Sequence, residues 1–150
     1  MQRRPLSDPR PRAVAVVVRD GKVLVMKRRL DGRAYAVLPG GGIEDGERAE
    51  DAALRELREE CSLDGAVGDL LLEAEHGGRH ASYFSILSVE GEPILGGEEA
   101  ETQDESNQYQ PAWADPDELG RLGLLPEEIA PLVVLWCEVA EARDGHPQRH

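Results

Sequence analysis

The sequence is short of cysteine, of basic residues and of long apolar runs. It contains two cysteines among 150 residues. Cys61 and Cys137 each fall on an apolar face of an expected helix, which predicts buried free thiols and neither a disulfide nor a metal site. The apolar run 13–18 near the N-terminus is too short for a signal peptide or a membrane span. A cytoplasmic, reducing environment is therefore expected.

Positive charge is also scarce. Lys and Arg number 17 against 30 Asp and Glu, which gives a formal net charge of −13. This balance argues against a surface for nucleic acids or membranes. A polyphosphate substrate would be repelled by such a chain unless metal ions bridged it to the protein. The sequence shows no internal repeat, and its length predicts one domain over residues 12–143, after a flexible leader (1–11) and before a disordered tail (144–150).

The rest of the chain is organised around residues 39–63, where three glycines precede a segment of good helix formers. This stretch predicts a Gly-rich loop that leads into a helix over 49–61. On that helix Glu56, Glu59 and Glu60 share one arc, beside an apolar arc formed by Ala53, Leu57 and Cys61. Clustered like charges destabilise a helix by a few tenths of a kcal/mol per pair. They become favourable when a hard divalent cation binds among them, since magnesium takes oxygen ligands.

The same stretch resembles the Nudix box, G-x5-E-x7-R-E-U-x-E-E-x-G-U, in which U is a bulky aliphatic residue. Gly41 begins the match, Glu47 is its first glutamate, RELREE at 55–60 fills the central motif, and Leu63 closes it. Ser62 stands where the family has glycine, a residue that usually ends the helix in a left-handed conformation. Serine adopts that conformation less easily, so a differently shaped loop is expected after Cys61.

The resemblance implies an α/β fold, the Nudix α/β/α sandwich, with a mixed β-sheet flanked by helices. It also implies hydrolysis of a phosphoanhydride bond with Mg²⁺ (or Mn²⁺) as cofactor. Glu56 and Glu60 are the expected metal ligands, together with the carbonyl group of Gly40. Glu59 is expected to be a further ligand or to act as base through a metal-bound water. Catalysis is accordingly assigned to Glu56 and Glu59, with Glu99 as a third catalytic carboxylate.

Three further residues are expected to support this site, and one to contact the substrate. Glu47 and Arg55 are expected to form an ion pair that fixes the loop against the helix, beside Gly41 at the start of the motif. Arg28, at the end of a predicted strand, is the candidate for a contact with the substrate phosphates or base, because basic residues near this position often have that role in Nudix proteins.

The segment 90–107 is polar and acidic, which predicts a mobile surface loop. Nudix proteins often supply one more carboxylate from this loop, as metal ligand or as base. Glu99 is the first candidate and Glu98 the second. His76 and His80 are predicted to be solvated residues of a hairpin connection.

The expected elements follow from apolar patterns and turn signals. A helix with an apolar stripe (Leu132, Leu135, Trp136, Val139, Ala140) is expected to close the domain. The predicted strands cover residues 13–18, 22–27, 35–38, 69–75, 82–89 and 109–113, and a short helix capped by Asp115 covers 117–122.

The substrate class is assigned by elimination. An ADP-ribose branch tends to have a proline about sixteen residues after the box, and the region around Arg79 has none; for a dinucleoside polyphosphate branch, Tyr83 lies somewhat late. The default is a MutT-like nucleoside triphosphate pyrophosphohydrolase, with ADP-ribose, dinucleoside polyphosphate or nucleotide-sugar pyrophosphatases as alternatives. A non-catalytic nucleotide sensor is the alternative of another class. The expected partner is a nucleotide-type small molecule, and a homodimer is compatible with the family.

Overall fold

The computed structural model describes residues 10–145, apart from the side chains of residue 98 and of residues 141–145. Most of the expected leader and residues 146–150 of the expected tail therefore lie outside the described residues. The strands are β1 (Arg12–Arg19), β2 (Lys22–Leu30), β3 (Arg33–Val37), β4 (Gly40–Gly42), β5 (Ala66–His76), β6 (Arg79–Leu87) and β7 (Asn107–Ala114). The helices are α1 (Ala49–Cys61), α2 (Gly97–Thr102), α3 (Leu119–Leu122) and α4 (Ala130–Gly145), with 3-10 turns η1 (Pro116–Glu118) and η2 (Glu127–Ile129).

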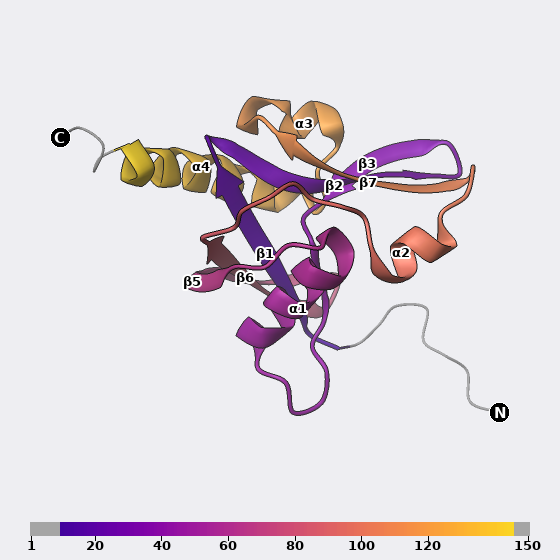
Figure 1. Cartoon of the computed structure of the whole chain (residues 1–150), viewed down its shortest axis with the longest axis horizontal. Helices are drawn as coiled ribbons and strands as arrows, with labels where there is room; N and C mark the ends of the chain where they lie inside the picture. Colours follow the sequence, from indigo (N-terminus) through magenta and orange to yellow (C-terminus); the bar gives the residue numbers. More distant parts are fainter. Residues whose placement is uncertain (1–9, 146–150) are drawn as a thin grey trace.

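The strands form one mixed sheet of seven strands, with helices on both of its faces (Figure 1). Five strands follow the order β3-β2-β1-β6-β5, while β4 pairs with β1 and β7 pairs with β2. β1 runs parallel to β6 and antiparallel to β2 and β4. The predicted α/β/α sandwich is thereby confirmed. Among the described residues, no helix has the length and the apolar character needed to span a membrane.

β1 is the central strand because its side chains are apolar on both faces. Ala13, Ala15 and Val17 pack in the cluster that contains α1, whereas Val14 and Val16 pack in the cluster that contains α4. A strand that is buried on both faces reads as a continuous apolar run, as this one does. β1 thus joins the two halves of the core and holds the neighbouring glycines in place.

The three glycines before α1 form a strand, and the expectation of a plain loop is wrong for them. Gly40 to Gly42 pair with β1, with Val14 opposite Gly40 and Arg12 opposite Gly42. A Cβ atom on Gly40 would lie 2.6 Å from the carbonyl oxygen of Ala13. Because real Cβ atoms do not approach so closely, only glycine allows this segment to lie against β1.

Helix α1 begins at Ala49 and ends at Cys61, as predicted. Ser62 adopts the left-handed conformation (φ 60°, ψ 34°) that glycine usually supplies, and its backbone N–H donates to the Arg58 carbonyl at 3.0 Å. The Ser62 hydroxyl donates to the carbonyl oxygen of Ile94 at 2.9 Å. The expected change in the shape of this loop is therefore not seen, because this hydrogen bond stabilises the serine in the strained conformation.

A pair of substitutions at Ser62 separates the strain from the hydrogen bond. Ser62→Gly is expected to leave the free energy of unfolding within about 0.5 kcal/mol of wild type, since relief of about 1 kcal/mol of strain offsets a hydrogen bond of similar size. Ser62→Ala keeps the strain and loses the hydrogen bond, so it is expected to be about 1 kcal/mol less stable. Urea denaturation of the three proteins measures both values. An alanine variant as stable as the glycine variant would refute this account.

The acidic segment after β6 is more ordered than predicted. It packs on the C-terminal end of α1, where the Ile94 N–H donates to the Cys61 carbonyl (2.9 Å) and the Gly96 N–H donates to the Glu60 carbonyl (3.1 Å). These donors satisfy carbonyl groups that the helix end leaves without partners. The chain then forms α2, which carries Glu99 back toward α1.

Two other predictions about single elements are corrected. His76 belongs to β5 rather than to a solvated connection, and its side chain is only 17% exposed because it bonds to Tyr83 and Glu128. In α4 the buried residues include Val133, Trp136 and Cys137, whereas Leu135 of the predicted stripe is 56% exposed. Cys61 and Cys137 are buried free thiols, as predicted.

Candidate active site

Three glutamates on one flank of α1 lie in three different environments. Glu60 is 8% exposed, the Glu56 side chain is 15% exposed and the Glu59 side chain is 54% exposed. The gradient arises because Leu57 and Cys61, on the adjacent face, are fully buried and draw Glu60 toward the core. One helix turn therefore presents a buried, a half-buried and an exposed carboxyl group to the same region.

Helix α2 adds a fourth carboxyl group to this region. Glu99 lines a polar hollow of about 570 Å³ together with Glu56, Glu59 and Glu60. Arg10, Gly42, Glu44, Arg55 and Gly97 complete the lining. Of the two candidates in the acidic segment, Glu99 thus lies beside the helix glutamates, while the side chain of Glu98 lies outside the described residues.

Arg55 connects this hollow to the loop before α1. Its guanidinium forms a bidentate ion pair with Glu47, at 2.8 Å from Nε and 3.0 Å from Nη2, and Nη2 also donates to the Gly42 carbonyl at 2.9 Å. Nη1 donates to Glu56 at 3.0 Å and to Glu59 at 3.3 Å. The ion pair predicted between Glu47 and Arg55 is therefore present, and it lowers the pKa of Glu47 and raises the pKa of Arg55.

Glu60 has an unusual charge environment. Burial raises its pKa to about 10, and a hydrogen bond with Glu56 and the charges of Glu56 and Glu99 act in the same direction. Arg12 opposes this shift, as the smallest of the effects. A buried carboxyl group surrounded by other carboxyl groups needs either a proton or a cation. Of the carboxyl groups in this site, Glu60 is the most buried, so it most needs a proton or a cation to offset its charge.

The side chains around this hollow offer oxygen donors, the type that a hard divalent cation prefers. Among the described residues, no group of three or more His, Cys, Asp and Glu side chains is placed to hold an ion. Arg55 holds the carboxylates of Glu56 and Glu59. The chemistry nevertheless fits a hard cation: all four acids offer oxygen, and Gly40 lines an adjoining hollow together with Glu60 and Glu99.

Arg28 lies on the wall of that adjoining hollow, which has a volume of about 250 Å³. Its guanidinium lies 3.9 Å from the ring centre of Tyr109 and 5.5 Å from that of Tyr35. It also donates to the hydroxyl of Tyr35 at 3.1 Å. Arg28 is therefore close to the glutamates, as the prediction requires, but tyrosines hold its guanidinium in place.

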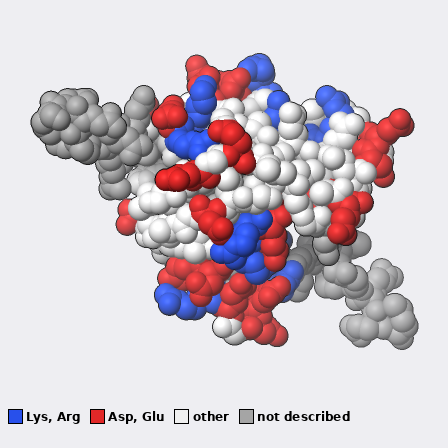
Figure 2. Space-filling model, viewed as in Figure 1, with Lys and Arg blue, Asp and Glu red and all other residues white. Residues whose placement is uncertain are grey.

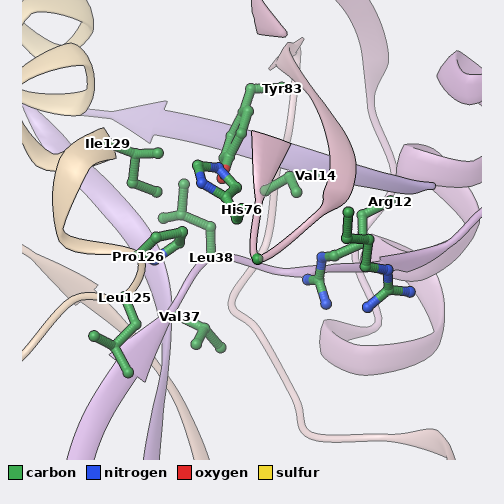
Figure 3. A pocket seen from close by; sticks show the side chains of 11 residues that line it. Arg12, Val14, Val37, Leu38, His76, Tyr83, Leu125, Pro126 and Ile129 are labelled. Carbon is green, nitrogen blue, oxygen red and sulfur yellow. The ribbon is translucent and has the colours of Figure 1, made fainter. Parts of the chain in front are cut away.

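A further cavity was not predicted from the sequence. It has a volume of about 440 Å³ and lies beside the η2 turn and the hairpin between β5 and β6 (Figure 3). Most of its lining is apolar, and Arg12, His76, Arg79 and Tyr83 add polar groups. The apolar lining residues are Val14, Val37, Leu38, Leu125, Pro126 and Ile129. They come from segments far apart in the sequence, so no local pattern indicates the cavity.

The charges on the surface are unevenly placed. Figure 2 shows acidic side chains crowded over the part of this face where α1 and the preceding loop lie, with basic side chains among them. On a chain with a net charge of −13, such crowding would repel an anionic substrate. The basic residues that line the hollows (Arg10, Arg12, Arg28, Arg55, Arg79) are therefore important for any anion that binds here.

Comparisons with known proteins agree on the fold. In sequence, the chain is 28% identical to the CTP pyrophosphohydrolase of Escherichia coli over 135 residues, which cover 86% of this chain and 92% of that protein. Its structure resembles the solution structure of the E. coli ORF135 protein, with a TM-score of 0.65 and 27% identity over 89% of this chain and 91% of the other. It also resembles a MutT NUDIX hydrolase from Burkholderia pseudomallei, with a TM-score of 0.64 and 27% identity over 83% and 96% of the two chains.

Two shorter matches point to other pyrophosphatases. The chain is 47% identical to an RNA pyrophosphohydrolase of Sphingopyxis alaskensis over 59 residues (39% of this chain) and 33% identical to an ADP-ribose pyrophosphatase of Methanocaldococcus jannaschii over 91 residues (57% of this chain). It spans only 37% and 54% of the lengths of these relatives. The NUDIX domain family profile matches residues 9–148, and the chain therefore belongs to the NUDIX domain family.

Proposed function

We propose that this protein is a divalent-metal-dependent hydrolase that cleaves a phosphoanhydride bond in a nucleoside diphosphate-linked substrate, with a nucleoside triphosphate as the preferred class. The observation that carries the proposal is the convergence of Glu56, Glu59, Glu60 and Glu99 on one polar hollow. Two elements, α1 and α2, supply these carboxyl groups, and the buried Glu60 needs a cation to ionise. A solvated acidic helix face would place none of its carboxyl groups in the core.

The proposed roles of the acids follow their exposure. Glu56 and Glu60 would hold the ion, with the Gly40 carbonyl nearby and Glu99 as a further ligand or base. Glu59 is the most exposed of the three helix glutamates, so it has the freedom either to ligate or to accept a proton from the attacking water. When bound, Mg²⁺ or Mn²⁺ would neutralise phosphate oxygens and lower the pKa of the attacking water.

The supporting residues position these acids. Arg55 links Glu47 and the Gly42 carbonyl to the glutamates of α1, which fixes the distance between the glycine strand and the helix. Gly41 leaves room for the carboxyl group of Glu56. Arg28, oriented by Tyr35 and Tyr109, is proposed to contact the substrate along the wall of the adjoining hollow.

The apolar cavity is proposed to hold the nucleoside half of the substrate. Its volume of about 440 Å³ lies within the range of about 300–1,000 Å³ that is typical of small-molecule pockets, which are mostly apolar with a few polar groups. It shares Arg12, Val37 and Leu38 with the hollow that reaches Glu60 and Glu99. A nucleotide bound there would therefore extend its phosphates toward the carboxyl groups.

A substrate panel tests this proposal. Likeness to the E. coli CTP pyrophosphohydrolase over most of both chains favours nucleoside triphosphates, beginning with CTP. The panel includes ordinary and oxidised triphosphates, ADP-ribose, diadenosine polyphosphates, a nucleotide sugar and a 5′-triphosphorylated oligoribonucleotide, each with Mg²⁺ or Mn²⁺. Release of pyrophosphate and a monophosphate, abolished by a chelator, is the expected result. If no compound turns over but a nucleotide still raises Tm, the protein is a nucleotide sensor.

A substitution at Gly41 tests the packing of Glu56. A Cβ atom at this position would lie 2.5 Å from the Glu56 carboxyl group, which Arg55 holds in place. Gly41→Ala is therefore expected to displace that carboxyl group and to lower kcat about 10- to 100-fold, as loss of a group that orients metal ligands does. Gly120→Ala is the control, because a Cβ atom there meets no atom within 4 Å. Steady-state kinetics would contradict the prediction if both variants retained wild-type kcat.

A further inference from the structure

Arg12 lies where two hollows meet. It is the first residue of β1 and lines both the apolar cavity and the smaller hollow that contains Glu60, Glu99 and Gly40. Figure 3 shows its side chain at one end of the cavity, with Leu38, Pro126 and Ile129 toward the other. A ligand that fills the cavity and extends to the glutamates would therefore lie beside the three residues that line both hollows, Arg12, Val37 and Leu38.

The backbone of Arg12 is fixed from both sides. It pairs with Gly42 of the glycine strand on one edge of β1 and with Ala81 of β6 on the other. Side chains on paired strands are placed more accurately than side chains on loops. Arg12 thus starts from a rigid position beside the candidate active site.

The guanidinium of Arg12 differs from the others near the site. Arg55 is bonded to Glu47, Arg28 to Tyr35, and Arg79 to the backbone carbonyl of Arg10. Arg12 instead acts through its charge on two groups of the hollows, the carboxyl group of Glu60 and the phenol of Tyr83, and opposes the rise in the pKa of each. The Arg12 residue is only partly exposed. A phosphate group that enters where the two hollows meet would offer this guanidinium an anion that it can bind through two hydrogen bonds.

Two polar side chains on the cavity wall are bonded to each other. His76 and Tyr83 bond to each other at 2.9 Å, and the other ring nitrogen of His76 lies 3.0 Å from the carboxylate of Glu128. Their rings meet edge to face at a centroid distance of 5.9 Å. The cavity therefore combines an apolar wall, a pair of side chains already bonded to each other, and guanidinium groups, which suits a ligand with a flat apolar body and an anionic end.

We propose that Arg12 binds the phosphate group next to the nucleoside, and so orients the substrate with its base in the apolar cavity and its phosphoanhydride bond toward Glu60 and Glu99. This inference rests on the proposed function for the identity of the ligand, a nucleoside 5′-phosphate. It makes Arg12 a substrate-positioning residue. It also predicts that Arg12 does not increase the affinity of the protein for a nucleoside that carries no phosphate.

Binding measurements without metal test Arg12 separately from hydrolysis. The affinities of AMP, CMP, GMP and UMP, and of the four matching nucleosides, are measured by calorimetry with a chelator present. The proteins are wild type, Arg12→Gln, Arg12→Lys and the control Arg58→Gln, which alters an exposed arginine of α1. Melting curves establish that all four proteins are folded, and the lysine variant retains a cation if the glutamine variant is poorly folded.

Arg12→Gln is expected to weaken binding of the preferred monophosphate about 10- to 100-fold, as the loss of a charged hydrogen bond does. The affinity for the matching nucleoside should change less than about twofold. Arg12→Lys should recover part of the lost monophosphate affinity, because lysine keeps the positive charge but lacks the two parallel N–H donors of the guanidinium. Arg58→Gln should change neither affinity. In turnover assays KM should rise while kcat changes little.

The outcomes distinguish the two proposals. If Arg12→Gln binds monophosphates as tightly as wild type, the inference about Arg12 is overturned. The proposed function would still stand if wild type hydrolyses a nucleotide. An equal loss of affinity for the nucleoside and the monophosphate also overturns it, because Arg12 would then support the cavity only. Arg12→Gln could weaken the binding of monophosphates but not of nucleosides, while wild type hydrolyses no compound. That result would support the role of Arg12 in phosphate binding and would refute the proposed hydrolase function. Absence of any monophosphate binding to wild type overturns the inference.

Discussion

Glu60→Gln is expected to abolish hydrolysis and yet to raise the Tm of the chelator-treated protein. Glutamine keeps the size and hydrogen bonding of the buried side chain, but it cannot ionise. The rate should fall at least about 100-fold, since a proposed ligand is removed. Stability should rise by about 1–3 kcal/mol, the usual scale for relief of a poorly compensated buried polar group. For a chain of this length that corresponds to a Tm increase of about 2–10 °C.

The pH dependence gives this prediction a second readout. The folded pKa of Glu60 is raised from 4.5 to about 10, so between these values the folded state keeps a proton that the unfolded state has lost. Wild-type stability should therefore fall as pH rises through this window. The stabilisation by Glu60→Gln should be small at pH 5 and larger at pH 8, measured by thermal melts in the presence of a chelator.

Metal addition and a matched variant complete the experiment. Mn²⁺ or Mg²⁺ should raise the Tm of wild type, because an ion that binds only the folded state stabilises it, and should have less effect on Glu60→Gln. Glu101→Gln, which alters an exposed glutamate of α2, should leave both rate and Tm unchanged. An active Glu60→Gln variant, or one that melts below wild type at pH 8, would refute the assignment of Glu60.

Arg55→Gln is expected to have the largest destabilising effect of the changes considered. It leaves Glu47, whose side chain is 16% exposed, without its bidentate partner, and removes a donor to the Gly42 carbonyl. Breaking a buried pair costs about 3–5 kcal/mol. Because Arg55 is itself 20% exposed, a loss of about 2–4 kcal/mol is expected here. Urea denaturation measures this loss of stability. The rate of hydrolysis should also fall, because Arg55 no longer holds the carboxyl groups of Glu56 and Glu59.

A double-mutant cycle identifies the pair as the cause. The combined variant Glu47→Gln/Arg55→Gln should be less destabilised than the sum of the single variants, by about 1–3 kcal/mol. Arg55 lowers the pKa of Glu47, so the contribution of the pair is present above about pH 4.5 and is lost as pH falls through the folded pKa. Additive single variants, or a coupling that persists when Glu47 is protonated, would contradict an ion-pair origin.

Arg58→Gln is the matched control on the same helix. Arg58 pairs with Asp64, and both side chains are well exposed, at 59% and 71%. Surface ion pairs contribute about 0–1 kcal/mol, so this variant should lose less than about 0.5 kcal/mol and keep its rate. The contrast between Arg55 and Arg58, three residues apart, measures what burial adds to an ion pair in α1.

Local pattern determined the parts of this protein that depend on short-range interactions. The bounds of α1 could be predicted because its good helix formers are contiguous. The buried strand at residues 13–18 follows from its apolar content. The spacing of Glu56, Glu59 and Glu60 along a helix was sufficient to place them on one flank.

Only the tertiary structure decided how these elements meet. The glycines form β4 because β1 lies against them, and His76 is shielded because Tyr83 and Glu128 reach it from other elements. The apolar cavity and the position of Arg12 depend on β1, β6 and η2 coming together. Glu59 and Glu60 are neighbours in sequence, yet one is exposed and the other buried. A sequence pattern records which side chains share a face, whereas burial and charge depend on what the rest of the chain packs against that face.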